Sequence, residues 1–118
     1  MTDKELLELA AKAEGYTLVW GGTYGLGDTV VDCTDLPYIK SKDTDVADVY
    51  WNPHEDDGDA LRLAVKLNIH ITISEYKRTV CRQGHEFRTL EDHAADPYAA
   101  TRRAIVRAAA EIGKTITP

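Results

Sequence analysis

The stretch of sequence that decides the fold is DPYAATRRAIVRAAAEIG, residues 96–113. The carboxylate of Asp96 is suited to capping the first helical turn, and Pro97 occupies a position where a missing N–H costs nothing. Glycine takes positive φ without steric cost, so Gly113 predicts the end of the helix. We therefore expect a helix over 97–112. Its apolar stripe recurs at steps of three and four residues: Tyr98, Thr101, Ile105, Ala108, Ala109 and Ile112.

Two other stretches predict helices. Thr2 and Glu5 have the spacing of a capping box, and Gly15 follows an amphipathic segment, which predicts a short N-terminal helix. Acidic residues crowd the segment after Pro53, and such residues complement the positive end of a helix. We therefore expect a second main helix over 57–68.

The residues between these helices predict strands. Isoleucine alternates with polar residues over 69–74, which is typical of a half-buried strand. Strands are also predicted at 16–20, 29–31, 46–51, 78–82 and 87–90, the first three as an antiparallel meander. The glycine-rich stretch 21–27 and the stretch 32–48 are predicted to be a turn and a loop. We therefore expect an α+β fold, in which an antiparallel sheet of four to six strands packs against the two main helices, with the N-terminal helix beside them.

Length and composition favour one domain over residues 1–118. Apolar runs span only a few residues, so no membrane helix is expected. The N-terminus lacks a basic stretch leading into an apolar segment, so no signal peptide is expected either, and we place the protein in the cytoplasm. In that reducing compartment Cys33 and Cys81 are expected to be free thiols.

The net charge of −6 is unevenly distributed along the chain. Residues 1–59 contain 14 acidic and 4 basic residues, a net charge of −10, whereas residues 60–118 contain 6 acidic and 10 basic residues, a net charge of +4. A strongly acidic chain repels phosphates, so general DNA binding is not expected. The basic second half fits either a small anionic ligand or attraction between the two halves of the fold.

The sequence patterns of catalytic sites are missing. His85-Glu86 is not followed by a histidine at the spacing of a zinc-binding helix, and the four histidines lie in separate segments. Helix capping explains the carboxylates that follow His54, with an acid–base or metal site as the alternative. We therefore expect no catalytic residue, no metal site and no cofactor.

Arginine side chains of the second half suit phosphate recognition, because the guanidinium group binds phosphate through two parallel hydrogen bonds. We predict Arg82, Arg103 and Arg107 as phosphate ligands. Trp51 and Tyr98 are the aromatic residues predicted to stack on a base. The alternative is that the two aromatic residues belong to the core and that the arginines are solvated surface residues.

Three stretches of the chain resemble known sequences. They are MTDKELLELA at 1–10, WNP at 51–53 with DDGDALRLAV at 56–65, and EDHAADPYAATRRAIVR at 91–107. Together they resemble a family of small phage and prophage proteins, and the order of parts is distantly similar to that of the NinX-type phage proteins. The resemblance covers nearly half of the chain, leaves out residues 23–50, and supplies no catalytic residues.

The resemblance implies a phage accessory protein that acts in the host cytoplasm. We expect a counter-defence protein that binds and sequesters a nucleotide-type immune signal without cutting it, and that acts as a homo-oligomer. Two alternatives remain open. One is an acidic inhibitor that covers a basic surface of a host defence or DNA-binding complex, and the other is an enzyme acting on nucleotides. The expected partner is thus a small nucleotide or a host defence protein.

Overall fold

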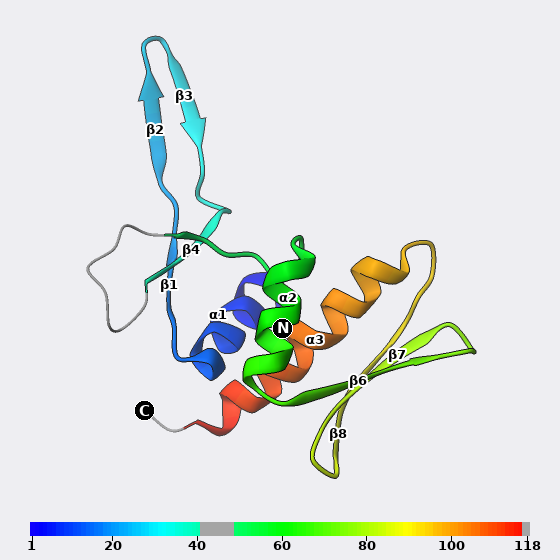
Figure 1. The fold of residues 1–118 in the computed structure, drawn as a ribbon. Coiled ribbons are helices and arrows are strands. Elements are labelled where there is room, and N and C mark those ends of the chain that lie inside the picture. The colour runs from blue at the N-terminus through cyan, green and yellow to red at the C-terminus, as the bar shows by residue number, and fades with distance from the viewer. Residues whose placement is uncertain (41–48, 117–118) are drawn as a thin grey trace.

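The computed structural model describes residues 1–40 and 49–116 and has the expected α+β class (Figure 1). The helices of this part of the chain are α1 (Asp3–Glu14), α2 (Asp57–Lys66) and α3 (Pro97–Thr115). The strands are β1 (Thr17–Trp20), β2 (Thr23–Leu26), β3 (Thr29–Asp32), β4 (Pro37–Lys40), β5 (Val49–Tyr50), β6 (Ile69–Ser74), β7 (Arg78–Gln83) and β8 (Glu86–Asp92).

The predicted helix starts are confirmed by their caps. Asp96 accepts hydrogen bonds from the backbone N–H groups of Tyr98 and Ala99, each at 3.1 Å, and Pro97 begins α3. Thr2 and Asp56 cap α1 and α2 through their side-chain oxygens. These contacts satisfy N–H groups that the first turn of a helix leaves free.

Helix α3 is the centre of the molecule, with α1, α2 and one sheet packed around it (Figure 1). Its buried residues cover more of its circumference than the predicted stripe, because Ala104, Val106 and Ala110 are also fully buried. Tyr98, which we expected on the core side, is 70% exposed. The small alanine side chains let the neighbouring elements approach closely, so that α3 is covered on most sides.

The end of α3 differs from the prediction, since the helix continues past Gly113 to Thr115. Gly113 is helical and has no positive φ. A Cβ atom at this position would lie 2.9 Å from the carbonyl carbon of Leu9 in α1, and closer still to its oxygen. Glycine is therefore needed here for the close crossing of α1 and α3, and not for a helix cap.

The C-terminal sheet has the order β6-β7-β8, is antiparallel throughout, and packs one face on α3. Thr79 and Cys81 of β7 are fully buried on that face. Thr89 of β8 donates a hydrogen bond of 2.7 Å to the carbonyl oxygen of Ala104, which ties the sheet to the helix. A bulge between Cys81 and Arg82 shifts the register with β8.

The remaining strands do not join this sheet. The N-terminal sheet has the order β1-β4-β5, and β2 and β3 form a separate hairpin that projects away from the helices (Figure 1). The predicted meander of 16–20 with 29–31 is therefore wrong. The glycine-rich stretch contains β2, which pairs with β3 around a turn where Gly27 has a φ of 63°. β4 begins at Pro37, a position where a strand tolerates proline.

Candidate functional site

The two arginines predicted on α3 share one carboxylate. Glu91 of β8 lies 2.5 Å from Arg107 and 3.6 Å from Arg103, measured between the side-chain nitrogen and oxygen atoms. The side chains of Arg103 and Arg107 are 50% and 44% exposed, and that of Glu91 is 16% exposed. The pair of guanidinium groups is thus already partly neutralised by a protein carboxylate.

Arg82 lies on the other face of the C-terminal sheet. Its neighbours Cys81 and Thr79 face α3, and side chains alternate between the two faces of a strand. Its cross-strand partners are His70 on β6 and Phe87 on β8, which are exposed like Arg82 itself. The structure therefore does not bring Arg82 to Arg103 and Arg107, and the three predicted phosphate ligands do not form one site.

The two predicted stacking residues have opposite environments. Trp51 is 4% exposed, and its ring lies edge-on to Tyr16 with 6.2 Å between the ring centroids. A ring enclosed in the core is not accessible to a base, so we assign no stacking role to Trp51. Tyr98 is accessible at the first turn of α3, beside Ile73 and Thr101 in the lining of a surface hollow.

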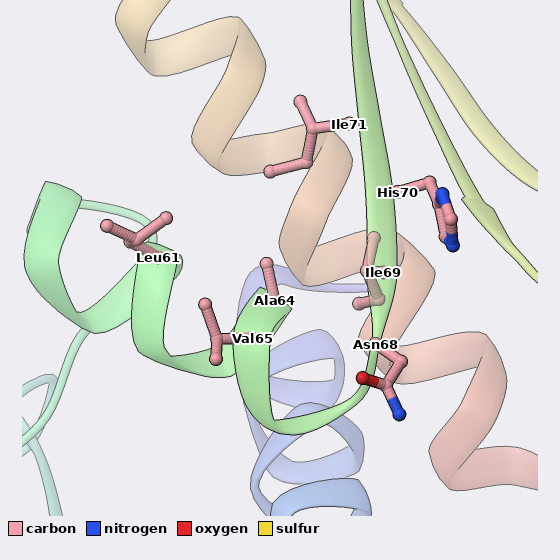
Figure 2. Close-up of a pocket in the computed structure, with 7 residues that line it drawn as sticks. All are labelled: Leu61, Ala64, Val65, Asn68, Ile69, His70 and Ile71. Carbon is pink, nitrogen blue, oxygen red and sulfur yellow. The ribbon is translucent and has the colours of Figure 1, made fainter.

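That hollow is one half of an apolar groove, which we call the α2–β6 groove. Its first half has a volume of about 350 Å³ and is lined by Leu61, Ala64, Val65, Asn68, Ile69, His70 and Ile71 (Figure 2). Its second half, of the same volume, is lined by Asp57, Ala60, Leu61, Ile71, Ile73, Tyr98, Thr101, Arg102 and Ile105. Leu61 and Ile71 belong to both halves and join them.

The rim of the α2–β6 groove exposes large apolar side chains. Leu61 and Val65 of α2 are 58% and 69% exposed, Ile73 of β6 is 65% exposed, and Tyr98 of α3 contributes its exposed ring. They come from three elements and border one depression. A contiguous exposed apolar surface of this kind is typical of an interaction site.

One wall of the groove is the edge strand β6, which among the strands of residues 1–40 and 49–116 pairs with β7 alone. Alternate residues of an edge strand direct their N–H and C=O groups outward, where another strand can pair with them. β6 has the sequence IHITIS and contains no Asp, Glu, Lys or Arg. The opposite edge of the same sheet, β8, contains Glu86, Arg88, Glu91 and Asp92. Charged side chains protect β8 against pairing with another strand, whereas β6 lacks this protection.

Charges lie at the two ends of α2 beside the groove. Asp57 at its start forms an ion pair of 2.6 Å with Arg102, which also donates a hydrogen bond to the backbone oxygen of His54. Arg62, in the middle of α2, is paired with Asp59 at 2.7 Å, and Lys66 in the last turn borders Val65 in an adjoining hollow. Arg102 is therefore engaged in packing, and the apolar middle of the groove lies between an acidic and a basic end of α2.

Burial shifts the pKa values of several groups outside the groove, among them His54, Glu14 and Cys81. Burial lowers the pKa of His54 and raises the pKa of Glu14 above its ordinary value. Burial also raises the pKa of the Cys81 thiol to about 11, which keeps the thiol protonated and unreactive. Both cysteines are free, as predicted.

The described residues contain no cluster of three or more potential metal ligands among His, Cys, Asp and Glu. They also contain no helix that is long and apolar enough to cross a membrane.

The alternation of isoleucines identified β6 from the sequence, but no sequence signal showed that this strand lies at an edge. Leu61 and Val65 are missing from the predicted site because the sequence places them at ordinary positions of an amphipathic helix. No family model, curated protein or solved structure matches the chain.

Proposed function

We propose that this protein is a non-catalytic binding protein that accepts an extended polypeptide segment in the α2–β6 groove. The observation that carries the proposal is the uncharged edge strand β6 beside the exposed side chains of Leu61 and Val65. The bound segment adds to β6 as a fourth strand of the C-terminal sheet. Its backbone pairs with the free edge, and its alternate side chains contact α2.

The chemistry of the groove favours a polypeptide over a nucleotide. Isoleucine, leucine, valine and tyrosine side chains dominate its rim, and the arginine in its lining, Arg102, is held by Asp57. A nucleotide needs cations for its phosphates, and none of the predicted phosphate ligands Arg82, Arg103 and Arg107 lines the groove. A protein partner agrees with the alternative of an inhibitor that binds a host defence or DNA-binding complex. The phage counter-defence role is part of the proposal only because of the sequence resemblance.

The direction of α2 specifies the partner further. β6 follows α2 after two residues, and the two elements diverge from the turn that joins them (Figure 2). A strand antiparallel to β6 therefore runs toward that turn, as α2 does. The start of that strand lies near Asp57 and its end near Lys66. We therefore propose a segment with apolar residues at alternate positions, a basic residue near its start and an acidic residue near its end.

The experiment that tests the proposal is selection of random twelve-residue peptides displayed on phage against the immobilised full chain. Selected sequences are expected to alternate apolar with polar residues. The variant Ile73→Lys places a charge on the exposed rim and is expected to weaken their binding by at least about tenfold. Val30→Lys is the matched control, because Val30 is 72% exposed and lies on the distant hairpin.

Peptides that bind Ile73→Lys as tightly as the unmodified chain, or that lose binding equally with Val30→Lys, would place the binding site elsewhere. Thermal melting against a panel of cyclic dinucleotides and trinucleotides tests the nucleotide alternative. A saturating ligand stabilises a protein by about 2.7 kcal/mol at 100 times its Kd. A shift of that size with a cyclic nucleotide, abolished by replacing Arg103 and Arg107, would replace the polypeptide proposal by the nucleotide one.

A further inference from the structure

We infer that a second copy of this chain occupies the α2–β6 groove, with the two β6 strands paired antiparallel across a two-fold axis. The inference rests on the proposed function, because it uses the same strand-accepting edge, and it names the partner. The product is a six-stranded sheet in the order β8-β7-β6-β6-β7-β8, with the helices of both copies on one face.

The sequence of β6 is complementary to itself. Residues that are opposite in an antiparallel pair share one face of the sheet, so a two-fold axis perpendicular to the sheet pairs positions of the same parity. With Ile71 opposite Ile71 of the second copy, Ile69 lies opposite Ile73 and His70 lies opposite Thr72. All three isoleucines then have isoleucine partners, and no two like charges face each other.

The two-fold axis also makes the charges at the ends of α2 complementary. α2 runs toward the turn from which β6 departs, so a two-fold axis between antiparallel β6 strands also places the two α2 helices antiparallel (Figure 2). The acidic first turn of one helix, with Asp57, then faces the basic last turn of the other, with Lys66. The dipoles of the two helices are opposed as well, which favours this arrangement.

The net charge of the chain favours a contact between two copies through the uncharged strand β6. Each chain carries −6, so two copies repel each other wherever acidic surfaces meet. β6 has no formal charge, and the neighbouring Leu61 and Val65 are apolar and exposed. Pairing through β6 covers the apolar rim in both copies without bringing like charges together. The charged edge β8 offers no such contact: with Thr89 opposite Thr89 of a second copy, Glu86 of each chain would face Asp92 of the other.

The test is sedimentation equilibrium of the full chain over a range of concentrations, with Ile73→Lys and the control Val30→Lys. The unmodified chain and the control are expected to sediment with twice the 13.1 kDa mass of one chain. Ile73→Lys, which places two lysines in each interface, is expected to raise the dimer Kd by at least about tenfold. Circular dichroism spectra that match the unmodified chain show that the variant is folded.

The register has its own test. In a Cys33→Ser background, His70→Cys combined with Thr72→Cys is expected to form a disulfide-linked dimer under mild oxidation, because opposed residues lie within reach of a disulfide. His70→Cys alone is expected to stay unlinked. Linkage by the single variant, or none by the double variant, would overturn the register.

The outcomes separate this inference from the proposed function. A monomer at all concentrations, or a dimer unaffected by Ile73→Lys, overturns the second copy as partner. If selected peptides still bind that monomer at the groove, the proposed function stands. A dimer that Ile73→Lys dissociates, together with a selection that yields no groove-binding peptide, supports the inference and overturns the capture of a foreign segment.

Discussion

Replacing Gly113 by alanine tests the central packing of the fold, because two physical effects predict opposite signs. Alanine is favoured over glycine in a helix interior by about 1 kcal/mol, so helix propensity alone predicts a more stable protein. The structure predicts the reverse. An added Cβ would lie 2.9 Å from the carbonyl carbon of Leu9 and 3.3 Å from its Cα atom. These are backbone atoms, which cannot rotate away as a side chain can.

The magnitude follows from the displacement that the methyl group requires. The closest contact is with the carbonyl oxygen of Leu9, which lies nearer still than the carbonyl carbon. To relieve it, α1 and α3 must separate by about 1 Å, a gap that forfeits about half of each dispersion contact. The interface contains the fully buried residues Ala10, Ala11, Ala108 and Ala109. Overpacking of a well-packed core costs about 1–3 kcal/mol, and the upper end, about 3 kcal/mol, applies here because the clash is with backbone atoms. We expect a net loss of about 2 kcal/mol after the gain in helix propensity.

Urea unfolding followed by circular dichroism at 222 nm measures this loss, and thermal unfolding provides a second measurement. A loss of about 2 kcal/mol lowers the Tm of a domain of this size by roughly 10 °C. The control is Gly58→Ala in α2, where the nearest atoms are the side-chain tips of Asp56 and Arg62. These tips move at little cost, so this variant is expected to stay within about 1 kcal/mol of the unmodified chain.

A second variant separates the backbone clash from loss of side-chain packing. Shortening the neighbour in the double variant Leu9→Ala/Gly113→Ala leaves the clashing backbone atoms in place, so it is expected not to restore stability. A Gly113→Ala protein as stable as the unmodified chain, or more stable, would refute the close crossing of α1 and α3. The glycine would then be an ordinary helix residue, and the interpretation of the helix end would have to change.

Three further predictions concern buried groups. Cys81 is fully buried with its pKa raised to about 11, so the native protein is expected to react with Ellman's reagent at Cys33 alone and the denatured protein at both thiols. Glu14→Gln is expected to raise the free energy of unfolding at pH 7 by about 1 kcal/mol, because burial raises the pKa of Glu14 and its Oε2 has no hydrogen-bond partner. Below about pH 4.5 the carboxyl group of Glu14 is protonated in the folded chain and no longer costs stability. The gain from Glu14→Gln should therefore vanish there. Burial lowers the pKa of His54, so stability should fall as the pH drops below about 6.5, where the unfolded chain takes up the proton first. The variant His54→Gln is expected to have a smaller slope between pH 6.5 and 5, and an equal slope would contradict the assignment.

The sequence predicts candidate residues of the functional site but not which of them lie together. Trp51 was predicted as a stacking residue from its type alone, and the fold encloses it against Tyr16. Arg82 and Arg103 were grouped by charge, but a strand and a helix place them on different sides of one sheet. Tyr98 is the predicted stacking residue that the fold leaves exposed beside the groove. Residue type identified candidates, whereas their grouping required the packing of distant elements.

The sequence by itself determined the elements whose signals lie within a few residues of one another. Caps at Thr2, Asp56 and Asp96 act over two or three residues, and the alternation over 69–74 is a property of one strand. Only the tertiary structure decided which strand lies at an edge, which carboxylate neutralises the arginines of α3, and why Gly113 stands inside a helix. These properties depend on contacts between segments that are far apart in the chain, such as Leu9 with Gly113. Local patterns carry no information about such contacts, because chain packing alone brings those residues together.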